Sequence, residues 1–225
     1  MDAKRSKVFA KIAREITIAA RLGGGDSDMN PRLRLALLKA RGANMPADNI
    51  TRAIQRGTGE GVAASFEELS YEIYGPHGAA ILAEISTDNR NRTSADIRAI
   101  LTRNDGKMAT AGSVSRLFHR KGQIMIARDA ANEDELMELA MEAGAEDFKA
   151  ESEGYEVLTA PEDFEAVHQV IESKEIAMET AEITQLPEML APVSSEAELE
   201  KVHKLVDLLE DHDDVQSVFT NAEMA

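Results

Sequence analysis

The sequence of 225 residues contains no cysteine and no tryptophan, and aromatic residues make up only 4% of it. The absence of cysteine excludes a disulfide framework, a thiol nucleophile and a cysteine-ligated zinc site. The longest uninterrupted apolar run, Ala79 to Ala83, is far shorter than the about 20 residues that cross a bilayer. The N-terminus also lacks the apolar stretch of a signal peptide. We therefore expect a soluble, cytoplasmic protein with no membrane partner.

Charge is distributed unevenly along a chain whose net charge is −16. Residues 1–57 carry 12 Lys and Arg against 5 Asp and Glu, and residues 58–122 carry 8 of each kind. Residues 123–225 carry 5 basic and 28 acidic residues. Asymmetry of this size indicates separate roles for the parts of the chain. We expect the basic part to attract polyanions and the acidic part to repel them, which limits non-specific coating of nucleic acid.

Apolar residues at helical spacing predict amphipathic helices in the basic N-terminal part of the chain. Gly23–Gly25 ends the first helix, and Asn30-Pro31 begins the second with an N-capping side chain and a proline at the first helical position. Pro46 opens a third helix that ends at Gly57. Three short helices with short connections predict a small bundle over residues 1–62.

After this bundle, alternating apolar and polar residues predict strands that are separated by helices. We expect one helix to begin at Thr93, where Thr93 and Asp96 resemble a capping box. We also expect a turn at Lys121-Gly122 between two strands, and a linker marked by Pro187 and Pro192.

The order of these elements predicts an α+β fold of three domains, in which a helical bundle precedes two small ferredoxin-like α+β domains. The middle segment has strands but only one helix, so we expect the last helix and strand to return to its sheet. The predicted domains are a helical basic domain of residues 1–62, a central α+β domain of residues 63–122 with 193–225, and an acidic inserted α+β domain of residues 123–192.

No pattern typical of catalysis or metal binding stands out in the sequence. The five histidines do not have metal-ligand spacing, and Gly23–Gly25 lacks the Lys-Ser/Thr of a phosphate-binding loop, so we interpret it as a hinge. The acidic run Glu210–Asp214 fits either a divalent-cation site or, more often, a solvated turn. We expect a protein that is not an enzyme, with no catalytic residues, no metal and no cofactor.

Basic side chains on the predicted helices are the candidate binding residues, because a guanidinium group binds two phosphate oxygens at once. Arg90 and Arg92 are expected in a loop just before a helix N-terminus, where they either bind an anion or pair with carboxylates. Only Phe9 and Phe118 lie in the basic stretches, so we do not expect a base-stacking platform for single strands. The candidate nucleic-acid-binding residues are Arg32, Arg34, Lys39, Arg41, Arg52, Arg56, Arg90 and Arg92.

Several short motifs spread over the whole chain carry a family resemblance. They are Asp2-Ala-Lys-Arg-Ser-Lys-Val-Phe-Ala-Lys-Ile, Gly23-Gly-Gly-Asp26, Asn30-Pro-Arg-Leu-Arg34, Asn44-Met-Pro46, Tyr71-Glu-Ile-Tyr-Gly-Pro76, Asp88-Asn-Arg-Asn-Arg-Thr93 and Gly112-Ser-Val114. In this order and at this spacing they resemble the YebC/PmpR family, which includes mitochondrial translational activators. The resemblance implies one helical and two α+β domains. It also implies roughly twenty further N-terminal residues, including Gly-His-Ser-Lys-Trp and more basic side chains, which this chain lacks and which would add to its positive surface.

The resemblance implies a regulator of gene expression that binds nucleic acid. We expect a non-enzymatic, DNA-binding transcriptional regulator whose partner is duplex DNA. The alternative is a translation factor that binds ribosomal or messenger RNA, with the ribosome as its partner, since both partners are polyanions. A third hypothesis is an adaptor whose acidic domain binds basic proteins.

Overall fold

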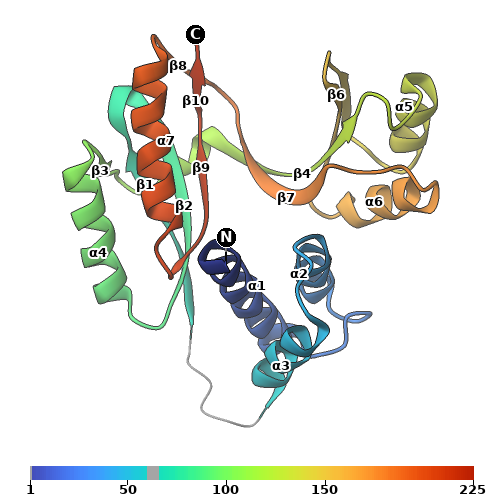
Figure 1. The fold of residues 1–225 in the computed structure, drawn as a ribbon, viewed down its shortest axis with the longest axis horizontal. Helices are drawn as coiled ribbons and strands as arrows, with labels where there is room; N and C mark the ends of the chain where they lie inside the picture. The colour runs from blue at the N-terminus through green and yellow to red at the C-terminus, as the bar shows by residue number, and fades with distance from the viewer. Residues whose placement is uncertain (1, 60–65) are drawn as a thin grey trace. The chain divides into compact units, whose positions relative to one another are not determined.

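The computed structural model describes residues 2–59 and 66–225, which form an α+β protein (Figure 1). The described residues divide into two compact units. The first unit lies within residues 1–117 and 187–225, and the second unit consists of residues 118–186. Each unit has its own sheet.

The first unit begins with a helical bundle. Its helices are α1 (Asp2–Gly23), α2 (Pro31–Gly42) and α3 (Ala47–Thr58). The Asn30 side chain caps α2 by accepting a hydrogen bond from the Leu33 N–H at 3.1 Å, as the sequence predicted. Both α2 and α3 pack on α1 around a buried core of Ile12, Ile16, Ala19, Leu33, Ala36, Ala40, Met45 and Ala53.

A glycine sets the distance between α3 and α1. A Cβ atom on Gly57 would lie 2.5 Å from the Thr17 carbonyl oxygen and 2.7 Å from the Ala20 Cβ. The two helices can therefore approach this closely only because residue 57 has no side chain.

Replacing Gly57 with alanine should lower the free energy of unfolding by about 1–3 kcal/mol, because the new methyl group forces α3 away from α1. Urea unfolding followed by circular dichroism measures the change. Gly42→Ala is the matched control, since a Cβ at the end of α2 meets no atom within 4 Å. Equal stability of the two variants would contradict the close packing.

The central sheet of the first unit has the strand order β3-β1-β2-β9. Its strands are β1 (Glu67–Tyr74), β2 (Ala80–Thr87), β3 (Lys107–Met108) and β9 (Val215–Thr220). All three pairings are antiparallel. The last long strand of the chain therefore lies beside β2, as the element order led us to expect.

Two helices cover this sheet (Figure 1). They are α4 (Arg90–Arg103) and α7 (Glu196–Glu210). Alternate strand residues such as Ile73, Ile81 and Ile85 face them in one buried cluster. The helices contribute Ile97, Leu101, Val202, Leu205 and Leu209 to that cluster.

The linker predicted at Pro187 and Pro192 falls where the chain passes from the second unit back to the first, after Leu186. Both prolines nevertheless lie in strands. Pro187 is the last residue of β7 (Thr180–Pro187), and Pro192 lies within β8 (Ala191–Val193), which pairs in parallel with β10 (Ala222–Met224). Proline is tolerated here because β8 belongs to a two-stranded sheet and has only one partner strand.

The second unit has the βαββαβ order of a ferredoxin-like domain, with strand order β5-β6-β4-β7. The central sheet has the same four-strand, two-helix composition but connects its strands in a different chain order. The remaining elements of the second unit are β4 (Phe118–Ala127), α5 (Glu133–Glu142), β5 (Asp147–Ala150), β6 (Gly154–Thr159) and α6 (Phe164–Ser173). Two short 3₁₀ helices, Pro76–Gly78 and Ser115–Leu117, belong to the first unit.

The predicted turn at Lys121-Gly122 was wrong, because both residues lie inside the continuous strand β4. Gly122 is opposite Thr159 of β6. A Cβ atom on Gly122 would lie 2.2 Å from the Thr159 Oγ1 and 2.6 Å from the Phe164 ring. Residue 122 is therefore glycine for packing and not for chain reversal.

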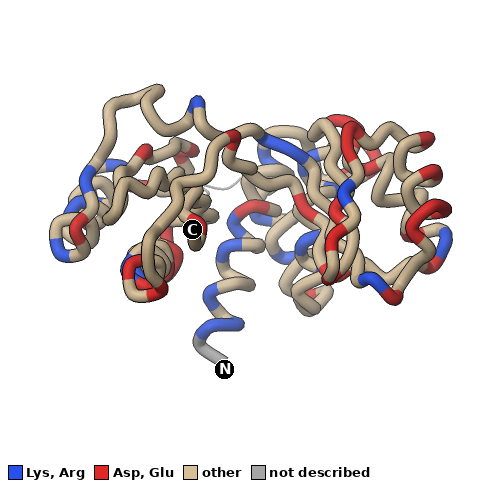
Figure 2. Tube along the Cα trace, turned by 90° about the horizontal axis from the view of Figure 1, so that it is seen from above, with Lys and Arg blue, Asp and Glu red and all other residues tan. Residues whose placement is uncertain are grey.

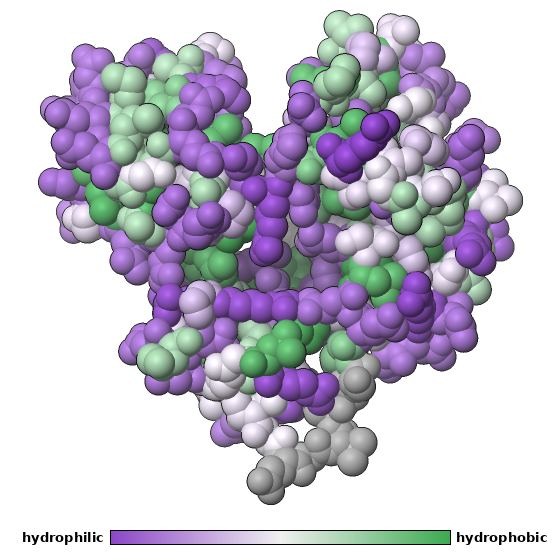
Figure 3. Space-filling model, turned by 180° about the vertical axis from the view of Figure 1, so that it is seen from behind, coloured by the Kyte–Doolittle hydropathy of each residue, from purple (hydrophilic) through white to green (hydrophobic). Residues whose placement is uncertain are grey.

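The exact limits of the three predicted domains stay a prediction, since the described residues separate into two compact units. Hydrophilic residues cover most of the face shown in Figure 3, with hydrophobic residues in small patches. In the described part of the chain, no helix is long and apolar enough to cross a membrane.

Candidate nucleic-acid interface

The eight predicted binding residues lie on three helices of the first unit. Arg32, Arg34, Lys39 and Arg41 are on α2, Arg52 and Arg56 are on α3, and Arg90 and Arg92 are at the start of α4. Figure 2 shows further cationic positions along the helix that starts at the N-terminus. What distinguishes the eight residues is whether another group already neutralises each charge.

Two cations of α2 are paired with carboxylates. The Arg32 guanidinium forms two hydrogen bonds with the carboxylate of Glu68 on β1, which raise the pKa of Arg32. The Lys39 Nζ lies 3.6 Å from the Glu15 Oε2 on α1, with both side chains partly exposed. These pairs reduce the charge that either residue offers to phosphate.

The Arg34 side chain is bonded to the loop that precedes α2. Its Nη1 donates hydrogen bonds to the Ser27 carbonyl at 2.7 Å and to the Asp28 carbonyl at 2.8 Å. Arg34 thereby fixes the connection between α1 and α2. A substitution at residue 34 would disturb this connection as well as any ligand contact.

Three arginines on the bundle surface have no acidic partner among the residues that the structure describes. Arg41 and Arg56 are exposed, and their side chains have no hydrogen bond or ion pair with another residue that the structure describes. Arg52 bonds only neutral oxygens of its own helix, at the Asp48 carbonyl and the Asn49 amide. Because Arg52 and Arg56 are four residues apart on α3, they lie on one face. These three residues are the strongest part of the predicted site.

The predicted loop around Arg90 and Arg92 is the first turn of α4. The helix begins three residues before Thr93, and its N-cap is Asn89, which accepts a hydrogen bond from the Arg92 N–H at 3.1 Å. The capping-box interpretation of Thr93 and Asp96 was therefore wrong. Thr93 is fully buried, and its hydroxyl donates a hydrogen bond to the Asp214 carboxylate at 2.7 Å.

Arg90 and Arg92 are both occupied by carboxylates, which is the alternative that the sequence left open. The Arg90 Nη1 lies 3.2 Å from the Glu67 Oε1. The Arg92 Nη2 lies 2.9 Å from the Asp88 Oδ1 and 2.8 Å from the Asp214 Oδ2.

Asp214 is the centre of a buried polar cluster, and only 6% of its side chain is exposed. Its carboxylate accepts hydrogen bonds from the Thr93 hydroxyl at 2.7 Å and the Thr87 hydroxyl at 3.2 Å, in addition to Arg92. The Arg14 Nη1 on α1 lies 3.4 Å away. Burial alone would raise the pKa of Asp214, but the hydrogen bonds from Arg92 and Thr93 outweigh it and hold this pKa below its ordinary value. Asp214 therefore joins α1, β2, α4 and the start of β9.

Three exposed arginines between residues 90 and 121 were not among the predicted binding residues. Arg98 and Arg103 on α4 and Arg116 have no side-chain ion pair with the described residues. Their position between residues 90 and 121 was the available signal. Which arginines are paired depends on carboxylates far away in the sequence.

Comparison with known proteins identifies the family. The model of the TACO1/YebC protein N-terminal domain matches residues 1–60, and the model of the TACO1/YebC second and third domain matches residues 66–222. The chain belongs to the TACO1/YebC family. The resemblance that the sequence motifs indicated is confirmed.

Relatives of this TACO1/YebC chain match it over its full length. A protein of Carboxydothermus hydrogenoformans named probable transcriptional regulatory protein is 52% identical over 100% of this chain and 93% of its own length. A protein of Chloroherpeton thalassium with the same name is 52% identical over 100% of this chain and 90% of its own. The crystal structure of a conserved hypothetical protein from Aquifex aeolicus has a TM-score of 0.86 and 43% identity, and the match covers 100% of this chain and 92% of that one.

The motif Gly112-Ser-Val114 lies in a loop whose backbone N–H groups surround a carboxylate. The Glu72 side chain accepts hydrogen bonds from the N–H groups of Gly112 and Val114, both at 2.6 Å, and of Ser115 at 2.8 Å. Burial would raise the pKa of Glu72, but these N–H groups lower it overall. The loop therefore binds an anionic group of the protein itself, the Glu72 carboxylate.

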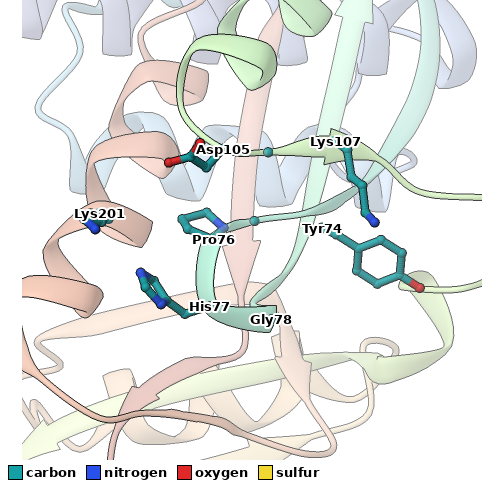
Figure 4. A pocket seen from close by; sticks show the side chains of 9 residues that line it. Tyr74, Pro76, His77, Gly78, Asp105, Lys107 and Lys201 are labelled. Atoms are coloured by element: carbon teal, nitrogen blue, oxygen red, sulfur yellow. The ribbon is translucent and has the colours of Figure 1, made fainter.

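A second motif, Tyr74-Gly-Pro76, lines an open groove of about 680 Å³ (Figure 4). Lys107, Lys201 and Asp105 also line it, so its charges are mixed. Figure 4 shows these side chains arranged around Pro76. His77 also lines the groove, and its Nδ1 lies 3.4 Å from the Glu198 Oε1. In the described residues, no group of three or more metal-ligating side chains is present.

Proposed function

We propose that this TACO1/YebC protein is a non-enzymatic regulator of gene expression that binds duplex DNA through its helical bundle, in the cytoplasm. The observation that carries the proposal is a set of three arginines on α2 and α3 that have no acidic partner within the described part of the chain, Arg41, Arg52 and Arg56. They stand on helices that pack around a buried core, so their backbone positions are fixed before a ligand arrives.

The charge distribution and the relatives support this proposal. Residues 1–57 carry a surplus of seven basic side chains, whereas residues 118–186 carry 5 basic and 18 acidic ones. Figure 2 marks these acidic positions in red along the chain trace. A polyanion is therefore attracted to the bundle and repelled by the second unit. The relatives in Carboxydothermus and Chloroherpeton are named probable transcriptional regulatory proteins.

The arrangement fits contact with the phosphate backbone. Arginine guanidinium groups bind phosphate oxygens. These contacts position a protein on a duplex without reading its base sequence. The same contacts suit the phosphates of ribosomal or messenger RNA, so a translation factor bound to the ribosome is the competing function.

Binding to duplex DNA and to purified ribosomes, each titrated over salt concentration, tests the proposal. We expect saturable duplex binding. The logarithm of the binding constant should fall by about 0.9 per contacted phosphate for each tenfold rise in salt concentration. Ribosome binding without duplex binding would move the function to translation. Absence of binding to either polyanion would overturn nucleic-acid binding altogether.

A further inference from the structure

The acidic run Glu210–Asp214, which begins at the last residue of α7, contacts one face of α1. Lys7 and Lys11 are four residues apart on that face. The Lys7 Nζ lies 3.0 Å from the Asp211 Oδ1 and 3.3 Å from the Asp211 carbonyl oxygen. The Lys11 Nζ donates to the Glu210 carbonyl at 2.5 Å. Residues 211–214 form a turn between α7 and β9 in which Asp211 and Asp213 are exposed, in agreement with the solvated-turn interpretation. The run also holds two lysines of α1.

The run presents α1 with oxygens that resemble those of a phosphate backbone. It offers a carboxylate together with the carbonyls of Glu210 and Asp211, which carry the partial negative charge of a helix C-terminus. The hydrogen bond from Lys7 lowers the pKa of Asp211, and burial lowers the pKa of Lys11. The lysines thus already lie in an arrangement that binds closely spaced anionic oxygens.

The contacts differ in how easily a ligand could replace them. The Lys7–Asp211 pair is open to solvent, with 44% and 72% of the two side chains exposed, and exposed pairs contribute little net stability. Arg14 is held firmly, since only 19% of its side chain is exposed and it bonds the Ser86 and Asp213 carbonyls at 2.8 Å. A polyanion could therefore displace the turn from Lys7 and Lys11 while Arg14 keeps α1 attached.

We propose that Lys7 and Lys11 form a phosphate-binding surface on α1, which Glu210 and Asp211 occupy until nucleic acid displaces them. The turn acts as an internal competitor that weakens binding and raises its selectivity for ligands with closely spaced phosphates. This proposal rests on the proposed function, because it names a further surface for the same ligand.

Asp211→Asn tests the competition. We expect it to raise the affinity for duplex DNA by about two- to fivefold and to steepen the salt dependence by up to about 0.9, the value for one phosphate. Glu200→Gln is the control, because it removes the same charge from exposed α7 without a contact to α1. Adding Lys7→Ala to Asp211→Asn should abolish the gain, since the released lysine is then missing.

The outcomes separate this inference from the proposed function. If the wild type binds duplex DNA and Asp211→Asn binds no more tightly than Glu200→Gln, the competition is overturned and DNA binding stands. If no variant binds DNA or RNA, both are overturned. A gain that persists after Lys7→Ala would also overturn the role of Lys7.

Discussion

Replacing Asp214 with alanine is expected to lower the free energy of unfolding by about 3 kcal/mol, because the buried Thr87 and Thr93 hydroxyls and the mostly buried Arg14 lose a charged acceptor. The two threonine hydroxyls, Thr87 and Thr93, lose their shared acceptor inside the protein. Arg14 and Arg92 lose a common counter-charge. The loss therefore affects α1, β2 and α4 together.

Chemical denaturation measures this loss. Asp213→Ala is the matched control, because Asp213 is the exposed neighbour and contributes only its carbonyl oxygen to the contact with Arg14. We expect the control to change stability by less than about 0.5 kcal/mol. Similar stability of the two variants would show that the cluster does not hold the first unit together.

The pH dependence of stability provides a second test of the contribution of Asp214. The pKa of Asp214 is lower in the folded protein than its ordinary value of 3.8. Its contribution to stability is therefore fully present above pH 3.8 and is lost as the pH falls through the folded pKa. Asp214→Asn should remove this part of the acid sensitivity, which unfolding curves recorded between neutral and acidic pH would show.

Replacing Arg41 and Arg56 together with alanine is expected to weaken duplex binding about tenfold at about 0.1 M salt, because each removes a charge-assisted contact with phosphate. Stability should stay within about 0.5 kcal/mol of the wild type, since neither side chain has a partner among the described residues. Fluorescence anisotropy with a labelled duplex measures the affinity, and thermal unfolding measures the stability.

Lys174→Ala with Lys204→Ala is the control for this double variant. Both lysines are exposed, and the pair removes the same total charge outside the bundle. We expect a smaller loss of affinity from the control, through long-range attraction alone. An equal loss would mean that net charge, and not the bundle surface, determines binding.

Local signals in the sequence predicted much of the fold. Asn30 with Pro31 marked the start of α2, and the alternating residues of 215–220 matched β9. Gly122 was misread because a glycine required by packing against Thr159 looks the same in sequence as a glycine required by a turn. The short strands β5 and β10 were missed because four or three residues carry too little periodicity.

The candidate site was harder to predict for a reason of distance along the chain. Arg92 is neutralised by Asp214, which is 122 residues away, and Arg90 by Glu67. No pattern of neighbouring residues in the sequence predicts such ion pairs. Arg41 and Arg56 look equivalent to Arg32 in the sequence, yet among the described residues only Arg32 is paired with a carboxylate, that of Glu68 on β1. Composition located the basic part of the chain, and tertiary structure decided which of its charges remain available.

The most direct test of the central claim is the salt dependence of duplex binding for the wild type and for Arg41→Ala with Arg56→Ala. If these two arginines bind phosphates, the slope of log affinity against log salt should become shallower by about 1.8, or about 0.9 for each phosphate that is no longer neutralised. The same slope in both proteins would contradict the claim that the bundle surface binds the nucleic-acid backbone.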